Sequence, residues 1–357
     1  MSNISRINVL VLLMASFSGL SQSKPKIDLQ LSTYGSVGFF GTQFTQTAGL
    51  LSLKDSKYIQ QSVSSDGILI GNNAQDSSKP HGSLEIAVMG GTQLTFHTQK
   101  GAVSIGKVRA DITGLVADGN VQISEFAGRL NLFVKKGDIV ADAAQIEGNL
   151  VTQNGDITLK NPTRKVIVNA KNGTTSVQFT TDYPLPKPID YSLEVGEIYL
   201  GAVNQAAKLT LGQGNIYTDG AMKEAELSIT QEGSIRINSA RAGVKALTRK
   251  GNIELSLLAD ASTDEPVWIQ TDEGNVVFKM PAKFSGTVEI EIMQTKDFDK
   301  PNGITSTLAL PVHLPKNTLS PTGLVISRRI VCRAVFGTSN RLVRIRVCNG
   351  NVQINQI

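Results

Sequence analysis

A short sequence unit recurs along most of this 357-residue chain and constrains its fold more than any other feature. The unit is a glycine, a small polar residue, an isoleucine or valine, a variable residue and usually another aliphatic, as in Gly119-Asn-Val-Gln-Ile123. From Gly82 to Gly274 the motif glycines are spaced by 19, 18, 18, 18, 18, 23, 18, 19, 18 and 23 residues. Such a fixed period is typical of repeat architectures. The glycines expected to serve as structural turn residues are Gly101, Gly119, Gly137, Gly155, Gly173, Gly196, Gly214, Gly233, Gly251, Gly274 and Gly350.

Each period is predicted to hold two short strands. Positions −7, −5 and −3 from the glycine are commonly apolar, as in Leu130, Leu132 and Val134 before Gly137. Positions +2 and +4 are apolar as well, while +1 and +3 are mostly polar. Alternation with period two indicates half-buried strands. The Gly-Asn or Gly-Asp pair between them is turn chemistry.

Two architectures fit this pattern: a meander of β-hairpins and a β-solenoid with one coil per period. The constant period favours the solenoid, because stacking demands coils of equal length. The two intervals of 23 residues are interpreted as a coil with an extruded loop, one at residues 183–188 and one at residues 259–266. The sequence therefore predicts an all-β fold, a β-solenoid or stacked β-strand repeat with an 18-residue period.

The organisation predicted along the chain has four parts. Residues 1–23 form a signal peptide, 24–80 an N-terminal cap or irregular β region, 81–280 the regular solenoid, and 281–357 an irregular insertion with closing repeats. The signal peptide is predicted from Arg6, the apolar run at residues 9–15, and Ser21 and Ser23 before a cleavage point at Lys24. The mature chain is expected to be exported, to the periplasm or the cell surface, without a transmembrane helix.

Composition narrows the classes of function. Apolar residues make up 40% and charged residues 18% of the chain, which predicts a folded rather than a disordered protein. A net charge of +5 is modest for this length, so no nucleic-acid partner is expected. With 3 His and 2 Cys, the chain does not fit a zinc ribbon, a disulfide scaffold or a haem carrier.

Several segments resemble a known family. Val151-Thr-Gln-Asn-Gly-Asp-Ile-Thr-Leu159, Leu247-Thr-Arg-Lys-Gly-Asn-Ile-Glu-Leu255 and the segments 271–281 and 342–354 are similar to the strand repeats of the "putative adhesin" family, domain of unknown function 4097. The resemblance covers roughly residues 82–357. It implies an exported bacterial β-repeat protein with no established enzymatic activity.

No catalytic or metal-binding arrangement is predicted. His81, His97 and His313 are far apart, and none has the spacing of a metal site. Calcium binding by the Gly-Asp pairs is disfavoured, because one acidic residue per 18 is better explained by turn geometry. We expect no cofactor.

The two cysteines and a group of arginines lie near the C-terminus. A disulfide between Cys332 and Cys348 is left open, although their alternation phases differ, Cys348 sharing the outward phase of Arg344 and Arg346. The basic patch is interpreted as a solvated face that deters edge pairing, with polyanion binding as the alternative. Its members are Arg328, Arg329, Arg333, Arg341, Arg344 and Arg346.

The favoured function is a non-catalytic, adhesin-like binding scaffold whose partner is an envelope or extracellular ligand, a glycan or a protein. The alternative is a β-helical carbohydrate-active enzyme, a polysaccharide lyase or hydrolase. Such an enzyme needs clustered carboxylates in a lateral groove. A third possibility, assembly into filaments through the coil ends, is disfavoured by the irregular flanks.

Overall fold

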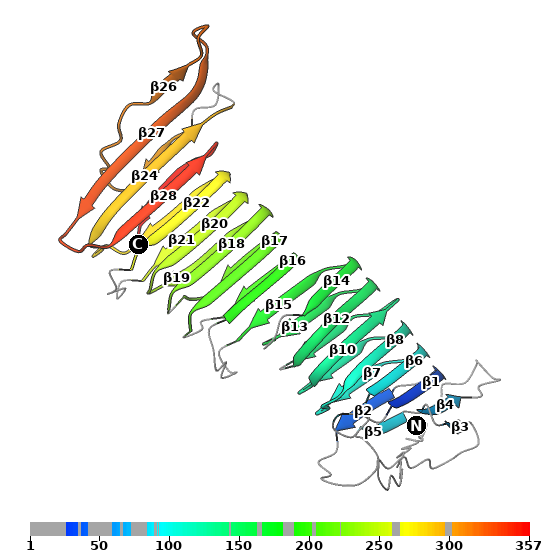
Figure 1. The fold of residues 1–357 in the computed structure, drawn as a ribbon. Coiled ribbons are helices and arrows are strands. Elements are labelled where there is room, and N and C mark those ends of the chain that lie inside the picture. The colour runs from blue at the N-terminus through cyan, green and yellow to red at the C-terminus, as the bar shows by residue number, and fades with distance from the viewer. Residues whose placement is uncertain are drawn as a thin grey trace, which may run out of the picture. The chain divides into compact units, whose positions relative to one another are not determined.

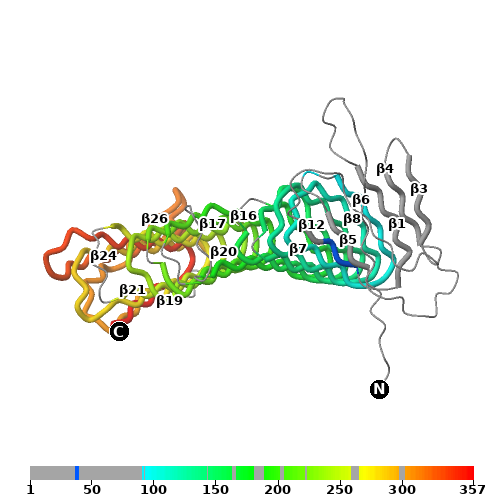
Figure 2. The backbone as a smooth tube through the Cα atoms, turned by 90° about the horizontal axis from the view of Figure 1, so that it is seen from below, coloured from blue at the N-terminus to red at the C-terminus, as the bar shows by residue number. Residues whose placement is uncertain are grey.

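Every element that the computed structural model describes is a β-strand. The described residues are 26–34, 37–41, 59–64, 67–72, 84–88, 91, 93–142, 144–162, 166–180, 189–201, 205–221, 223–258, 265–296 and 302–357. The chain divides into two compact units, Met1–Val177 and Gln178–Ile357. The predicted signal peptide lies outside the described residues. The predicted all-β solenoid class is confirmed: in each unit, successive turns of the chain stack on one another (Figure 2).

The first unit contains two mostly parallel sheets. The first sheet has the order β14-β12-β10-β8-β6-β1-β4-β3 (Figure 1), and in the second the order is β13-β11-β9-β7-β2-β5. A further strand, β15 (Thr175–Phe179), crosses the boundary between the units. The other strands are β1 (Lys26–Tyr34), β2 (Val37–Gly41), β3 (Ile59–Ser64), β4 (Gly67–Asn72), β5 (Leu84–Val88), β6 (Gln93–Lys100), β7 (Val103–Gly106), β8 (Asp111–Asp118), β9 (Val121–Ser124), β10 (Ala127–Val134), β11 (Ile139–Asp142), β12 (Gln145–Asn154), β13 (Ile157–Lys160) and β14 (Ile167–Asn172).

Aliphatic residues at equivalent positions stack into columns between the two sheets. Val103, Val121, Ile139 and Ile157 are partners in adjacent strands, and each is at most 1% exposed. Because every inward side chain contacts the equivalent residue of the next coil, no coil buries its core alone. Burial of each such side chain contributes about 1.5–3 kcal/mol.

The coil of β1 and β2 is placed out of chain order in the first unit. β1 pairs with β4 on one side and β6 on the other, and β2 lies between β5 and β7. Beyond this coil, β3 and β4 form an antiparallel hairpin. Within the region expected to be an N-terminal cap or an irregular β region, the structure therefore describes one regular coil and one hairpin.

The second unit also has two sheets, which share the long strands β16 and β17. One sheet has the order β16-β17-β18-β20-β22-β28-β24-β27-β26 (Figure 1), and the other runs β16-β17-β19-β21-β23-β29-β25. The strands are β16 (Ile189–Leu200), β17 (Ala207–Thr218), β18 (Ala225–Glu232), β19 (Ile235–Ala240), β20 (Val244–Lys250), β21 (Ile253–Leu257), β22 (Val267–Glu273), β23 (Val276–Met280), β24 (Gly286–Gln294), β25 (Ile304–Ser306), β26 (Lys316–Leu319), β27 (Val325–Phe336), β28 (Leu342–Cys348) and β29 (Val352–Gln356).

The closing coil of the second unit is intercalated in the stack. β28 pairs in parallel with β22 on one side and β24 on the other, although β24 precedes it in the chain. β29 likewise lies between β23 and β25. Beyond β24, β27 and β26 add two antiparallel strands. The predicted insertion therefore forms the outer layers of this unit, and the closing repeat lies beneath them.

The motif glycines are required by the close approach of successive coils. At Gly251, φ is +146°, and a Cβ atom would lie 2.0 Å from the carbonyl oxygen of Gly233. Gly350 has no positive φ, but a Cβ there would lie 1.7 Å from the carbonyl oxygen of Gly274. Turn conformation alone, the reason expected from the sequence, therefore does not account for these glycines; the corner leaves no room for a side chain.

The polar residue after the glycine connects one coil to the next. The backbone N–H of Asp156 donates to Oδ1 of Asp138, and that of Thr174 donates to Oδ1 of Asp156. In the second unit the N–H of Asn351 donates to Oδ1 of Asn275 across 76 residues of chain. The Gly-Asp and Gly-Asn pairs thus form hydrogen-bonded ladders along the corner.

Buried threonines at position −3 add a second contact to the same corner. The Thr152 hydroxyl donates to the carbonyl of Gly137, and Thr248 makes the equivalent bond to Gly233, each at 2.9 Å. Thr271 donates to Gly251 at the same distance. Sequence alternation had indicated only an apolar preference at this position. The hydroxyl satisfies a carbonyl that burial would otherwise leave without a partner.

The Asp156 carboxylate gives the first unit a testable pH dependence. The N–H and hydroxyl of Thr174 donate to it and lower its pKa below the ordinary 3.8. A carboxyl whose pKa is lower in the folded state stabilises the fold above its unfolded pKa, and this contribution is lost as the pH falls through the folded value. We expect Asp156→Asn to lose less thermal stability than the unaltered chain between pH 6 and pH 3. Equal losses measured by circular dichroism would contradict this expectation.

Candidate functional site

Outward side chains of the second unit form a continuous charged row across its first sheet. Neighbours in the row are direct strand partners. Lys208 and Lys245 contact Glu226 from the two sides, at 3.5 and 2.7 Å. The hydrogen bond from Lys245 holds the pKa of Glu226 below its ordinary value. We call the following residues the charged row: Asp190, Lys208, Glu226, Lys245, Trp268, Arg344, Glu289 and Arg333.

Trp268 interrupts the alternation of charge in this row. Its strand partners are Lys245 and Arg344, both cations. The guanidinium carbons of Arg344 and Arg346 lie 5.6 and 5.7 Å from the centre of the indole ring. These are cation–π distances, and such contacts fix the position of a guanidinium group. The indole ring thus orients two arginines at the C-terminal end of the row.

A hollow of about 310 Å³ lies at this end, which we call the C-terminal pocket. Its central acids are on β24. Nε and Nη2 of Arg344 donate to Oε2 of Glu289 at 3.1 and 2.9 Å, and Nε of Arg333 lies 3.5 Å from Oε1 of the same residue. Glu291 contacts Nε of Arg329 at 2.6 Å and Nε of Arg346 at 3.3 Å. The charged or titratable residues that line the pocket are Glu289, Glu291, His313, Arg329, Arg333, Arg344 and Arg346.

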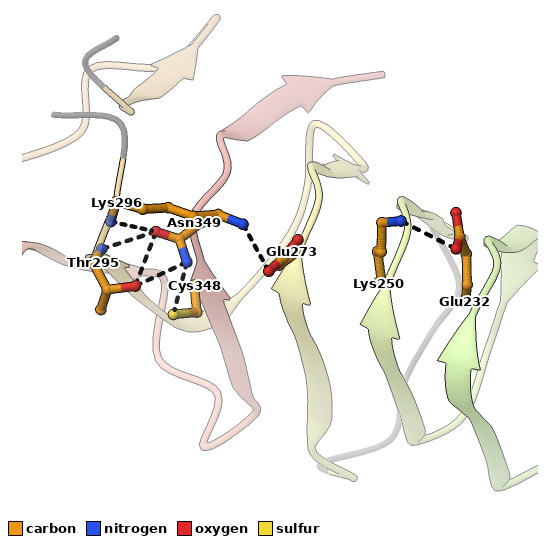
Figure 3. Close-up of polar contacts among 7 residues, drawn as sticks. All are labelled: Glu232, Lys250, Glu273, Thr295, Lys296, Cys348 and Asn349. Atoms are coloured by element: carbon orange, nitrogen blue, oxygen red, sulfur yellow. Dashed lines mark hydrogen bonds and ion pairs between the residues drawn. The ribbon is translucent and has the colours of Figure 1, made fainter. Parts of the chain in front are cut away.

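A second row follows the strand ends of the same sheet (Figure 3). Lys250 bonds Glu232 at 3.1 Å, and Lys296 bonds Glu273 at 2.8 Å and lowers its pKa. Asn349, at φ +57°, accepts the backbone N–H of Thr295 at 2.8 Å. This asparagine therefore fixes the chain where it leaves β24.

The second sheet of the same unit carries its own charged group. Glu254 contacts Lys279 at 2.5 Å and Arg236 at 3.6 Å, and the hydrogen bond from Lys279 lowers the pKa of Glu254. Nearby along this sheet, the rings of Tyr199 and Tyr217 stack with centroids 5.2 Å apart. The Glu254 group resembles the C-terminal pocket in charge type but lies on the other sheet, which makes it a useful control.

The histidines are dispersed, as the sequence indicates. His97 is half-buried on β6, and His313 is exposed, its backbone N–H bonded to the carbonyl of Val331. His81 lies outside the described residues. Among the described residues, no cluster of three or more His, Cys, Asp or Glu side chains is placed to hold a metal ion.

The structure places no disulfide between the two cysteines near the C-terminus. Cys332 and Cys348 are both free thiols. Their strands, β27 and β28, lie on opposite sides of β24, so they are separated by about 10 Å. A disulfide requires Cα atoms within about 7 Å. Burial raises the pKa of both thiols, which disfavours the nucleophilic thiolate.

The predicted basic patch is divided by the structure. Arg341 is 2% exposed, and its Nη2 donates to the carbonyl of Ala242 at 3.3 Å, so it does not belong to the surface. Arg328 donates to Asn317 on β26. The other four arginines line the C-terminal pocket. The sequence does not indicate their pairing with Glu289 and Glu291, because those acids lie in the segment that breaks the repeat.

The described residues include no helix with the length and apolar character needed to span a bilayer. A comparison with curated proteins finds no match for this chain. Among solved structures, a "putative cell adhesion protein" from Clostridium sporogenes matches this chain at 9% sequence identity and a TM-score of 0.18. The match covers 94% of this chain and 93% of that protein's chain.

A family model gives the remaining comparison. The model of the family Toastrack DUF4097 matches residues 43–187. This range begins before residue 82 and ends well before residue 357, the two bounds of the region in which the sequence motifs were recognised. It includes the regular coils of the first unit from β6 onward. The resemblance of this chain to the Toastrack DUF4097 family is thus confirmed over residues 43–187.

Proposed function

We propose that this chain is an exported, non-catalytic, adhesin-like scaffold that binds a glycan or protein ligand through its outward polar face. The observation that carries the proposal is the charged row of the second unit. Parallel stacking repeats each outward position from coil to coil, and strands lie about 4.8 Å apart. An extended ligand thereby meets one outward side chain per strand at regular intervals, and most of these side chains are charged. Many weak contacts then add up along its length.

The charged carboxylates of this unit support binding rather than hydrolysis. Glu226, Glu254 and Glu273 each accept a hydrogen bond from a lysine that lowers the pKa. The general acid of a glycosidase needs a raised pKa, so that it carries a proton near neutral pH. These three residues have the opposite property. The carbohydrate-active enzyme remains the competing proposal.

Export is part of the proposal and rests on the sequence of residues 1–23. Protein recovered from the outside of cells should begin near Lys24. Recovery of mature protein with Met1 intact would contradict export. This outcome would leave the binding role to be tested separately with purified protein.

Binding and turnover should be measured together on the purified chain. We expect retention on immobilised peptidoglycan or polysaccharide without release of reducing ends or ester hydrolysis. Single alanine substitutions at Gln122, Thr158 or Glu254 should change the affinity by less than about threefold, because most interface residues contribute little individually. Reproducible turnover that disappears on replacing one surface carboxylate, with the fold intact, would establish the enzyme instead.

A further inference from the structure

The C-terminal pocket carries more positive charge than its own acids neutralise. Four guanidinium groups face two carboxylates, which leaves an excess of two positive charges even with His313 neutral. The acids occupy the middle strand, β24, and the arginines flank them on β27 and β28. A concave, cationic surface of this kind attracts anions and concentrates them locally.

The guanidinium groups retain donors for a ligand. An arginine side chain has five N–H groups. Within the described part of the chain, Arg329, Arg333 and Arg346 each contact a glutamate through Nε. The terminal N–H groups of these arginines can therefore bind an oxyanion in the bidentate manner that guanidinium groups favour.

We propose that the C-terminal pocket binds the oxyanion groups, carboxylate or sulfate, of an acidic polysaccharide. This inference rests on the proposed binding function and names the ligand class for one end of the charged row. Arg344 and Arg346 are held by Trp268 and form one wall. Arg329 and Arg333, whose side chains are 57% and 70% exposed, form the other.

The spacing of the two walls favours a polymer over a single ion. β27 and β28 are separated by β24, so the two arginine rows lie about 10 Å apart. The carboxylates of Glu289 and Glu291 already bridge the two rows. An added ligand must therefore reach the remaining N–H groups on either side of these acids, which a chain with repeated acidic groups can do. Gln270, the strand partner of Arg346, supplies an amide beside the pocket that pairs with hydroxyl groups.

The two glutamates disfavour nucleic acid as the ligand. DNA carries one charge per about 1.7 Å of helix axis, so phosphates would be forced close to Glu289 and Glu291. An acidic polysaccharide has neutral, hydroxyl-bearing segments between its charges. The alternating Arg-Glu-Arg order across β27, β24 and β28 matches a ligand of that lower charge density.

The experiment is calorimetric titration of the full chain with polygalacturonate and with dextran sulfate, using neutral dextran and duplex DNA as comparisons. We expect binding of one or both acidic polysaccharides, weakened by added salt because screening shortens the reach of charges. Arg329→Gln combined with Arg333→Gln should weaken this binding about tenfold or more, since each substitution removes charge-assisted hydrogen bonds to the ligand. Glu289→Gln combined with Glu291→Gln should strengthen it severalfold, because two repulsive charges are removed.

The matched control is Arg236→Gln combined with Lys279→Gln, which removes two cations from the other sheet. This variant should bind within about twofold of the unaltered chain. The control variant and the Arg329/Arg333 variant should both melt within a few degrees of the unaltered chain, because exposed ion pairs contribute little stability. Equal losses in the control and pocket variants, unchanged affinity in the pocket variant, or binding of DNA alone would overturn the proposal. If the pocket variants have no effect while retention on cell-wall material persists, the acidic ligand is wrong and the scaffold function stands.

Discussion

Replacing Gly251 with alanine should lower the free energy of unfolding by about 2–5 kcal/mol, because two costs combine. The backbone there has φ +146°, a conformation that L-residues with a side chain rarely adopt. The new methyl group would also lie 2.0 Å from the carbonyl oxygen of Gly233, which belongs to the stacked backbone and cannot move away alone. Urea denaturation monitored by circular dichroism measures the change.

Gly303 provides the control for this substitution. A Cβ at Gly303 meets no atom within 4 Å, and no positive φ occurs there. Gly303→Ala should therefore change stability by no more than about 1 kcal/mol, and reduced freedom of the unfolded chain makes a small gain the expected direction. Similar losses at the two positions would show that coil stacking is not the reason for the motif glycine.

Deleting Gly119 through Lys136, one full period, should leave a folded chain with one coil fewer. The deletion joins Asp118 to Gly137, so that Asp118 takes the place of Lys136 before the motif glycine. It removes β9 and β10 together. The flanking coils keep their register: Ile112 and Gly148 both pair with Leu130, so they become partners of each other. The denaturant m-value should fall modestly, because less surface is exposed on unfolding.

Deleting only Gly119 through Ala127 should abolish cooperative folding. This half-period removes β9 and Ala127 but leaves the rest of β10, so a strand of the first sheet occupies the path of the second. Every repeat position after the deletion is then displaced from its partner in the next coil. This applies to the inward and outward residues, to the corner glycines and to the Asp and Asn oxygens that accept hydrogen bonds along the corner. Loss of the far-ultraviolet strand signal and of a sharp thermal transition is the expected result. Equal tolerance of the two deletions would contradict the stacked-coil architecture.

The period and the alternation were sufficient to predict the coils, because stacking imposes the same pattern on each one. Ile139, at position +2 of its coil, is fully buried, as that phase requires. The order in which coils stack was not predictable, because a terminal coil has the same pattern wherever it inserts. The intercalation of β28 is a consequence of long-range pairing that no local signal encodes.

For the candidate site, the sequence located the charges but not their partners. The outward phase of Arg344 and Arg346 follows from alternation along β28. Their contacts with Glu289 and Glu291 depend on β24 lying next to β28. This pairing could not be predicted, because β24 lies in the irregular segment. Arg341, by contrast, shares the inward phase of Val343 and Ile345, so alternation directs its side chain into the interior.

The intercalated closing coil sets a constraint on the timing of biosynthesis. A ribosome makes β22 first, then β24 and β27, and only afterwards β28, which must lie between β22 and β24. β24 cannot reach its final neighbour until that later strand has emerged, so the C-terminal unit closes only after translation has passed residue 348. For a chain exported as we propose, this delay keeps the last layers open to threading through a translocation pore.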